Sequence, residues 1–389
     1  MIYLDYSATT PVDSRVVDAM SPYFSTSFGN PSSIHRYGQI AEAAIDSARE
    51  SVASILNCAP DEIIFTSCGS ESDNLAIRGA AYAMREKTGA KWILASRAEH
   101  PAVTKTLLHL EKYEGFLIEW LDVNERGMVT SEIVSKAICG DTAIVSVMYA
   151  NNEIGTINPI KEIAQLCRSN QILFHTDAVQ AAAYLPLDVQ VLGIDMMSLG
   201  AHKFYGPKGV GALYVRKGTP LISHLTGGGQ EFNLRAGTQN VPYIVGLAEA
   251  LRLTNEEREQ RADHVRPLRD KIIGTVLETI PDSQLTGDLE SRLPHHASFV
   301  FQNMDGNLLL TLLDAAGFAC SSGSACKTGN PEPSEVMNAI GISRAWGLGS
   351  LRVTLGVHTT PADVDAFLKV LPDLVMKARM LNVKGQVAR

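Results

Sequence analysis

The sequence lacks the features that would mark a membrane-spanning, secreted or nucleic-acid-binding protein. Its longest apolar-rich stretch, 308–320, is interrupted by Thr311 and Asp314 and is too short to cross a bilayer. The N-terminus, MIYLDYSATTP, carries an early acidic residue and no basic segment, so no secretory signal is visible and we expect a cytoplasmic protein. A formal net charge of −8 disfavours non-specific binding to nucleic acid or to an anionic membrane.

Cysteine is scarce, and the spacing of the six cysteines argues against two further classes of protein. No Cys-x-x-Cys is present and no cysteine pair stands at zinc-finger spacing from histidines, so we expect no metal site. A disulfide framework is not expected in a cytosolic chain of 389 residues. Most cysteines are therefore interpreted as small hydrophobic side chains, with room for one reactive thiol among Cys58, Cys68, Cys139, Cys167, Cys320 and Cys326.

The length suggests two domains, and the first of them shows an alternating pattern of strands and helices. Strands are predicted at 63–67, 92–96, 117–122, 143–149 and 173–178, with helices at 71–85, 101–114, 131–138 and 160–168 between them. Strands separated by helical crossovers predict a mainly parallel sheet that is covered on both faces. Ligands bind such sheets at the carboxyl ends of the strands.

A long helical stretch, 241–280, follows and leads into a second, α+β part, with Pro267 expected to bend or divide the helix. In that part, strands are predicted at 297–301, 318–321 and 351–355, and helices at 308–316, 334–340 and 361–380. We therefore predict an α/β protein with a large domain over 14–260 and a smaller domain built from 1–13 and 261–389.

The stretch 198–214, SLGAHKFYGPKGVGALY, places Lys203 between an apolar strand and a glycine-rich turn. A lysine at such a strand end can be partly desolvated, which lowers its pKa and makes the amine nucleophilic. An imine-forming lysine requires this environment. The alternative interpretation is a surface lysine beside a hairpin.

A turn of small residues, Cys68-Gly69-Ser70, joins a predicted strand to a helix and presents free backbone N–H groups to an anion such as a phosphate. The alternative is a plain Ser70 N-cap with Asp73 as the acid of a capping box. The turn lacks the lysine and spacing of a P-loop. The glycines of 206–211 precede a strand, which does not fit the dinucleotide-binding pattern either.

Three further strand ends carry polar groups. His100 stands at a helix start, where an imidazole can stack on a planar ligand, move protons or simply cap the helix. Asn151, Asn152 and Glu153 offer donors and acceptors to a bound molecule, although turn chemistry alone also explains them. Asp177 ends an apolar strand, and a buried carboxylate there needs a cationic partner such as a protonated ring nitrogen.

Together these strand ends supply phosphate donors, a ring-stacking imidazole, an acid for a pyridine nitrogen and a nucleophilic lysine. Pyridoxal 5′-phosphate requires this set of groups. The prediction depends on the combination and its order along the chain, because each element alone is weak.

The chain also resembles the class V aminotransferase family, and within it the cysteine desulfurases of the NifS/IscS type. The motifs that carry the resemblance span nearly the whole chain: YLDYSATTP (3–11), GNPSS (29–33), TS with SES (66–72), EH (99–100), NNEIGT (151–156), HTDAVQ (175–180), AHK (201–203), GPKGVG (206–211), GGGQE (227–231), SSGSAC (321–326) and SLR (350–352).

The resemblance implies fold type I of the pyridoxal-phosphate-dependent transferases and a role for each matching residue. Lys203 would hold the cofactor and move protons, Asp177 would pair with the pyridine nitrogen, and His100 would stack on the ring and assist proton transfer. The remaining cofactor contacts that it implies are Gly69, Ser70, Asn152, Gln180, His202 and, from the partner subunit of a homodimer, Thr238.

For the substrate, the resemblance implies L-cysteine, with Arg352 and Asn152 as binding residues. Cys326 would attack the substrate sulfur, leaving alanine and a persulfide that passes to an acceptor such as an iron–sulfur scaffold. Cys320 falls on an apolar strand and is interpreted as a core residue. Two other reactions of the same fold, those of an aminotransferase and a selenocysteine lyase, stay open, as does a degenerate homologue that only binds partners.

Two positions depart from the family pattern. Gly200 stands where the family usually has a serine, so one phosphate hydroxyl is missing and weaker cofactor binding is expected. Cys68 replaces a usual glycine in the phosphate-binding turn. We interpret Cys68 as a bystander, the alternative being a thiol that reacts with the cofactor.

Overall fold

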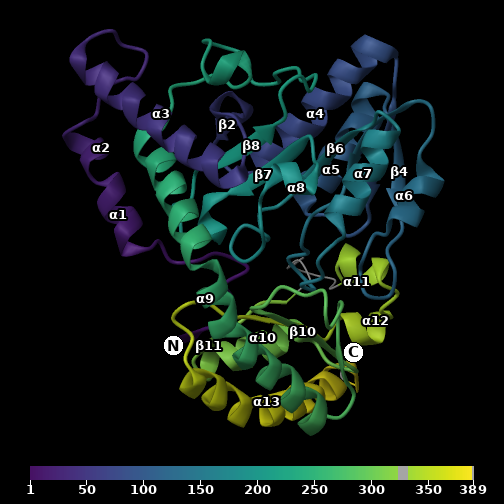
Figure 1. Ribbon diagram of the computed structural model, residues 1–389. Helices are drawn as coiled ribbons and strands as arrows, with labels where there is room; N and C mark the ends of the chain where they lie inside the picture. The colour runs from purple at the N-terminus through teal and green to yellow at the C-terminus, as the bar shows by residue number, and fades with distance from the viewer. Residues whose placement is uncertain (323–331, 388–389) are drawn as a thin grey trace.

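A computed structural model describes residues 1–322 and 332–387 of the chain. A larger part around one sheet and a smaller part below it are joined by the helix α9 (Val241–Thr279) (Figure 1). This helix is 39 residues long and continues through Pro267, so the predicted division does not occur. Val265 and Leu268, on either side of the proline, are buried, and this packing holds the helix together.

The larger part contains one seven-stranded sheet. Its strands, in spatial order, are β2 (Ile63–Thr66), β8 (Gly211–Val215), β7 (Met196–Gly200), β6 (Leu173–Asp177), β5 (Thr142–Ser146), β3 (Trp92–Ser96) and β4 (Leu117–Leu121). The strand β8 runs antiparallel to both of its neighbours, and the others run parallel to one another. The predicted, mainly parallel sheet is therefore present.

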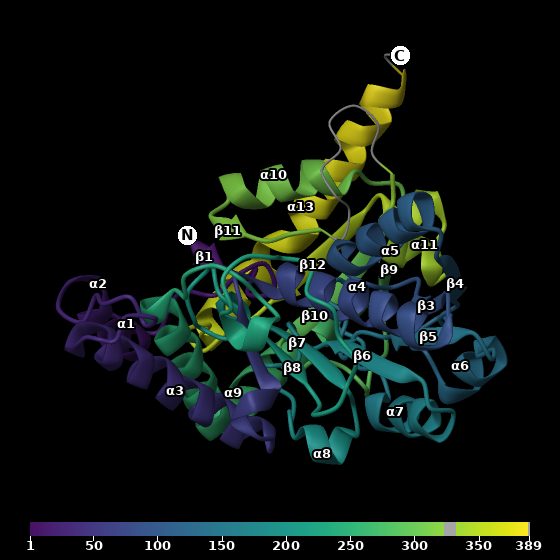
Figure 2. The ribbon, with the colours of Figure 1, turned by 90° about the horizontal axis from the view of Figure 1, so that it is seen from above.

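Both faces of this sheet are buried, as the apolar runs in its strands indicate. In β2, Ile63 and Phe65 belong to one hydrophobic cluster while Ile64 belongs to another, because successive side chains point to opposite faces. Figure 2 shows α4 (Gly69–Thr88) and α5 (Pro101–Glu114) on one face and α3 (Arg36–Leu56) and α7 (Ile160–Ser169) toward the other. This sandwich leaves the ends of the strands as the place for a site.

The smaller part is α+β and joins the two ends of the chain. It contains β1 (Ile2–Tyr3), β9 (Ser283–Leu285), β10 (His296–Phe301), β11 (Phe318–Ala319) and β12 (Ser350–Thr354), with α10 (Gly306–Ala315), α11 (Glu335–Ala339), α12 (Arg344–Gly347) and α13 (Pro361–Val387). The strand β1 pairs in parallel with β11, and β12, β10 and β9 form an antiparallel sheet in that order. The first residues therefore lie with the C-terminal part, although the domain boundaries at 14 and 260 stay a prediction.

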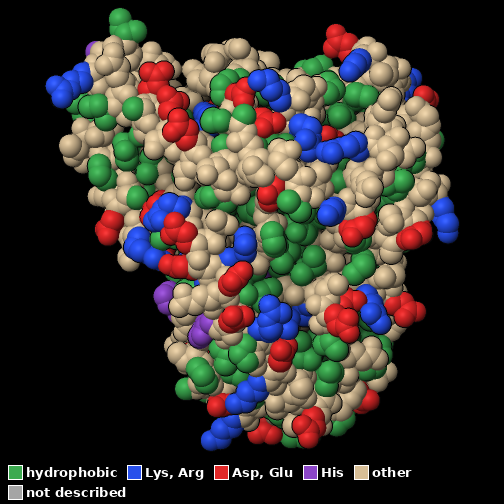
Figure 3. All heavy atoms as spheres, in the orientation of Figure 1, with side chains coloured by type: hydrophobic (Ala, Val, Ile, Leu, Met, Phe, Trp, Pro, Cys, Tyr) green, Lys and Arg blue, Asp and Glu red, His purple; other side chains and the backbone are tan. Residues whose placement is uncertain are grey.

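Four short helices complete the described fold: α1 (Ser14–Met20), α2 (Pro22–Ser25), α6 (Ser131–Ala137) and α8 (Val189–Leu192). Neither α8 nor β9 is predicted from the sequence. Among the described residues, no helix is both long and apolar enough to cross a membrane. Acidic and basic side chains are interspersed on the face shown in Figure 3. The cytoplasmic location stays a prediction.

Candidate active site

A cavity of about 300 Å³ opens at the carboxyl ends of the parallel strands. The chain segments that follow β2, β3, β5, β6 and β7 all reach it, as expected for a parallel sheet. Its lining contains nine residues that the sequence predicts for the site, namely Gly69, Ser70, His100, Asn152, Asp177, Gln180, His202, Lys203 and Arg352. It also contains Ser7, Ala8, Cys68, Asp73, Met148 and Val179.

Lys203 ends a 3₁₀ turn (Ala201–Lys203) that directly follows β7. Its Nζ donates hydrogen bonds to the carbonyl oxygens of Ser7, at 2.6 Å, and Ala8, at 2.8 Å. Burial lowers the pKa of this amine to about 8, and the nearby Arg352 charge contributes to the shift. The surface-lysine alternative is wrong, because Lys203 lines the cavity and its amine is held by two backbone carbonyls.

Asp177 is the last residue of β6 and is only 4% exposed. One carboxylate oxygen, Oδ1, accepts a hydrogen bond from the Val179 backbone N–H at 2.9 Å. Burial raises the pKa of this carboxyl, while the charges of His100 and Lys203 oppose the rise. The group therefore needs a cation to stay ionised, which a protonated ring nitrogen would supply.

His100 is at once a helix cap and a cavity wall. Its Nδ1 accepts a hydrogen bond from the Ala102 backbone N–H at 3.1 Å at the start of α5. The neutral ring then carries its proton on Nε2. Burial lowers the pKa of His100, which favours the neutral form.

The turn before α4 leaves an open helix N-terminus. The N-cap residue is Cys68, whose side chain makes no capping hydrogen bond, and Asp73 is buried rather than capping the helix. The Ser70 N-cap alternative is therefore wrong. A Cβ on Gly69 would lie 2.7 Å from Val179 Cγ2. A glycine therefore lets the turn pack closely against Val179. These groups and the exposed Ser70 hydroxyl suit an anion.

Arg352 lies on β12 and is 6% exposed. Its Nη1 donates to the carbonyl oxygen of Asn152 at 2.9 Å and its Nη2 to Oδ1 of Asp5 at 2.8 Å. Its buried Nε has no partner among the described residues. A guanidinium with this much unused donor capacity, facing the cavity, suits a substrate carboxylate.

Asn151 and Asn152, in the predicted polar run 151–153, have different surroundings. The amide of Asn151 is used up locally, since its Oδ1 accepts from the N–H groups of Glu153 and Ile154 and its Nδ2 donates to Ala98. Turn chemistry therefore explains Asn151, whereas Asn152 lines the cavity.

Several residues of the site escape prediction. The Ser7 and Ala8 carbonyl oxygens are backbone groups, so no side-chain pattern identifies them. Asp5 contacts Arg352 but lies far from it in sequence. Asp73 could have been suspected from the sequence, because an acidic residue on the buried face of a helix such as α4 is unusual.

Two buried acids contribute to the electrostatics of the cavity: Asp73, which lines it, and Glu99, next to His100. Burial raises the pKa of both carboxyl groups, and the neighbouring Asp177 charge adds to the rise. Glu99 Oε1 accepts from the Met148 N–H at 2.7 Å, and Asp73 Oδ1 lies 3.6 Å from His175 Nε2. Both shifts favour the neutral forms of Asp73 and Glu99.

The other predicted or candidate residues are Thr238 and three cysteines. Thr238 is exposed and does not line the cavity. Cys326 lies outside the described residues. Cys320 packs against the hydrophobic core, and burial raises the pKa of its thiol, which agrees with its interpretation as a core residue. Cys68 lines the cavity, and its interpretation as a bystander stays a prediction.

The described residues fit pyridoxal phosphate. The open N-terminus of α4, with Ser70 and His202, would hold the phosphate, the buried Asp177 would face the ring nitrogen, and Lys203 would bond the aldehyde carbon. His100 would cover one face of the ring, and Gln180 also lines the cavity.

The sequence profile described as aminotransferase class-V matches residues 2–367. The chain therefore belongs to the class V aminotransferase family, whose members use pyridoxal phosphate, and its fold is the predicted fold type I. A solved structure described as a NifS-like protein aligns with a TM-score of 0.90 at 37% identity, covering 97% of this chain and 99% of the other.

Among its relatives, the chain is similar to proteins named cysteine desulfurase IscS. The protein from Dictyoglomus turgidum is 45% identical over 98% of this chain and 96% of the relative. The protein from Methanosarcina thermophila is 47% identical over 98% of this chain and 93% of the relative. The resemblance drawn from the motifs is thereby confirmed.

The lowered pKa of Lys203 predicts when its amine reacts. Only the neutral amine is nucleophilic, so labelling of Lys203 in the cofactor-free protein should rise with pH and reach half its maximum near pH 8. Peptide mass spectrometry after a short pulse of an amine-reactive reagent measures this, with the exposed Lys87 as internal reference. A midpoint near the ordinary value of 10.5 would contradict the desolvated environment.

Two charges near Lys203 should move this midpoint in opposite directions. Arg352→Gln removes a cation that disfavours the ammonium, so the midpoint should rise, while Asp5→Asn removes an anion that favours it, so the midpoint should fall. Each shift should be up to about one pH unit, or about 1.4 kcal/mol. The same labelling measures both variants, and shifts of the same sign would rule out this electrostatic account.

Gly200→Ser should strengthen cofactor binding. An added Cβ would lie 3.4 Å from the Gly69 backbone N and 3.5 Å from Val179 Cγ1, which are tolerable contacts, and the hydroxyl would stand beside the phosphate-binding turn. One charge-assisted hydrogen bond stabilises by about 2 kcal/mol, so cofactor release should slow by roughly tenfold or more. Release is followed by cofactor absorbance during transfer to a trap. Gly140→Ser, at an open surface position, is the control and should change nothing.

Proposed function

We propose that this chain is a pyridoxal-phosphate-dependent cysteine desulfurase, which converts L-cysteine to L-alanine and passes the sulfur on as a persulfide. Membership of the class V aminotransferase family and the named relatives support it. The observation that carries it is the convergence of three groups on one cavity: an amine with a lowered pKa (Lys203), a buried acid (Asp177) and a buried guanidinium (Arg352).

Each residue has a task that follows from its surroundings. Arg352 binds the substrate carboxylate through donors left free by Asp5 and Asn152. Bound pyridoxal phosphate supplies an electron-withdrawing ring that makes the substrate Cα proton acidic. With the cofactor bound, Asp177 would keep the ring nitrogen protonated, and the neutral Lys203 amine would take up the substrate Cα proton and return it. His100, neutral in its buried setting, excludes water from one ring face and assists this transfer.

The sulfur step belongs to Cys326 in this proposal. Its thiolate attacks the substrate sulfur, the carbon–sulfur bond breaks with its electron pair left on the substrate carbon, and that carbon is then protonated to give alanine. Cys326 leaves the step as a persulfide, and a thiol of an acceptor protein, such as an iron–sulfur scaffold, takes the terminal sulfur.

The proposal includes a homodimer in which Thr238 reaches the phosphate of the partner subunit. Thr238 is exposed and away from its own cavity, and the described phosphate-binding residues of one subunit include only one hydroxyl, that of Ser70. Large apolar side chains are exposed in the neighbouring loop and helix, among them Phe28 at 65%, Ile34 at 93% and Tyr37 at 54%. Such a surface favours contact with another protein.

A comparison of substrates tests the reaction. Purified protein should be yellow and should release equal amounts of alanine and sulfide from L-cysteine with a thiol reductant. Cysteine, selenocysteine and cysteine sulfinate are assayed side by side, because a selenocysteine lyase would prefer the second. Formation of alanine from pyruvate and an amino-acid donor, without sulfide release, would instead identify an aminotransferase.

Cys326→Ala should keep the yellow colour and lose at least about a thousandfold of sulfide release, since the nucleophile contributes the sulfur-transfer step. Cys139→Ala, which removes an exposed thiol elsewhere, is the control and should retain full activity. Sulfide release that survives in Cys326→Ala, measured with the same reductant, would sink the assigned mechanism.

A further inference from the structure

The segment 230–239, which carries Thr238, has a strained backbone. Glu231, Phe232 and Asn233 have successive φ values of 45°, 56° and 66°. Non-glycine residues rarely enter this left-handed region, and a run of three is held only where the surroundings over-determine it. Strain of this kind implies that specific contacts hold the segment in this conformation.

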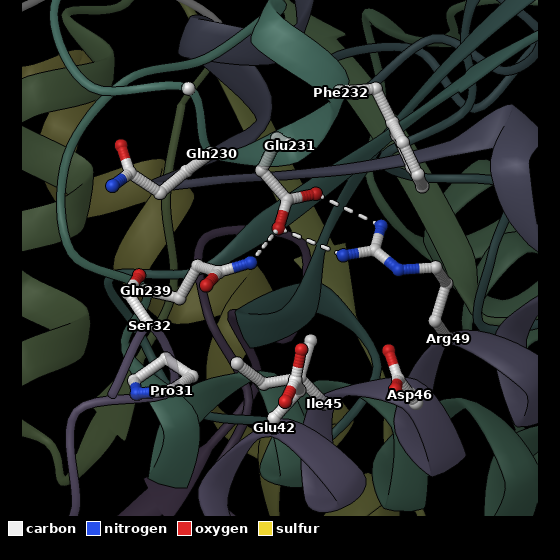
Figure 4. Close-up of a pocket in the computed structure, with 11 residues that line it drawn as sticks. Pro31, Ser32, Glu42, Ile45, Asp46, Arg49, Gln230, Glu231, Phe232 and Gln239 are labelled. Atoms are coloured by element: carbon white, nitrogen blue, oxygen red, sulfur yellow. Dashed lines mark hydrogen bonds and ion pairs between the residues drawn. The ribbon is translucent and has the colours of Figure 1, made fainter. Parts of the chain in front are cut away.

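A buried ion pair supplies such contacts (Figure 4). The side chain of Glu231 is 1% exposed, and its two carboxylate oxygens face the guanidinium of Arg49 on α3 at 2.8 and 2.9 Å. The Arg49 guanidinium also lies over the rings of Phe65 and Phe232, at 4.8 and 5.0 Å from their centroids. The pair is thus fixed by two hydrogen bonds and two ring contacts.

The same pair covers the free edge of the large sheet. The strand β2 is an edge strand, and its backbone leaves Ile63 O and Phe65 N pointing away from β8. Arg49 Nη1 donates to Ile63 O, and Phe65 N donates to Glu231 Oε2 at 2.8 Å. Segment 230–239 is therefore anchored to the sheet that carries the cavity.

Further hydrogen bonds connect this anchor to Thr238. Gln239, the next residue, donates from Nε2 to Glu231 Oε1 at 2.6 Å, and the Gly237 N–H donates to Gln230 Oε1 at 3.1 Å. Arg235 Nε donates to Glu71 Oε1 at 2.8 Å, and Glu71 lies in the first turn of α4 beside the phosphate-binding turn. Both neighbours of Thr238 are therefore fixed, while Thr238 itself stays exposed.

We propose that the Arg49–Glu231 pair is a positioning device, which acts through Gln239 to hold Thr238 where it binds the cofactor phosphate of a second copy of this chain. The inference rests on the homodimer of the proposed function and adds the residues that make the exchange possible. Arg49, Glu231 and Gln239 touch neither substrate nor cofactor, so their effect is on cofactor retention in the partner subunit. A cavity of about 360 Å³ beside the pair, lined in part by Pro31 and Ser32, gives Gln239 room to move once its bond is lost.

Gln239→Leu is the test variant, because it removes one hydrogen bond and leaves the buried ion pair intact. Mixed dimers are isolated with two affinity tags, and one subunit carries Lys203→Ala so that only the other subunit holds the coloured cofactor. Release of that cofactor to an excess of apo-acceptor is followed by absorbance. With Gln239→Leu in the colourless subunit, release should be about tenfold faster; with Gln239→Leu in the coloured subunit, it should be unchanged.

Three further variants sharpen the result. Thr238→Val in the colourless subunit should have the same effect as Gln239→Leu, and the two together should be no worse than either alone, since they break one chain of contacts. Glu42→Gln, on the exposed rim of the same cavity, should release cofactor at the wild-type rate. Arg49→Met with Glu231→Met replaces the ion pair by apolar side chains, a change that buried pairs tolerate, and should reproduce the faster release in a folded dimer.

The outcomes separate the inference from the function that underlies it. Faster release only when the variants lie in the coloured subunit, or an additive double variant, would overturn the positioning role while leaving the desulfurase proposal intact. A chain that is monomeric by light scattering would remove both the exchange and the homodimer. Faster release across the interface from a protein without desulfurase activity would support the positioning role and refute the reaction.

Discussion

Two hydrogen bonds, from Lys203 Nζ to the carbonyl oxygens of Ser7 and Ala8, join the N-terminal segment to the cavity of the large sheet. The N-terminal segment reaches Lys203 because β1 pairs with β11 and the Leu4 carbonyl accepts from Thr354 of β12. This pairing brings Asp5 to Arg352. The contact therefore joins three regions that are hundreds of residues apart.

Charge at this edge is regulated by burial. Burial raises the pKa of the Asp177, Asp73 and Glu99 carboxyl groups and lowers the pKa of the Lys203 amine to about 8, and the Asp177 charge adds to the rise at Asp73 and Glu99. The apolar faces of the large sheet supply the low dielectric that makes these shifts possible.

Much of this arrangement could be predicted. The strand-end positions of His100, Asp177 and Lys203 follow from the βα pattern, and the structure brings them to one cavity. The roles of Asn151 and Ser70 were open between local and functional alternatives, and only hydrogen bonds decided them: Asn151 is a turn residue, while Ser70 stands in an uncapped helix start. Pro267 also shows how far local sequence rules reach. The proline disfavours a continuous helix, yet α9 continues through it because the residues on either side are packed in the core.

The sequence by itself determined the fold class, the order of the site residues and the cofactor chemistry, because periodicity and residue type act locally and repeat along the chain. Tertiary structure alone decided which backbone carbonyls meet Lys203, which acid contacts Arg352, and which ion pair anchors the segment that carries Thr238. Those contacts join Ser7 to Lys203, Asp5 to Arg352 and Arg49 to Glu231. The partners lie so far apart in the sequence that no local hydrophobic pattern indicates the contact. The strain at Glu231 is likewise visible only in the backbone angles, since a glutamate there looks ordinary in sequence.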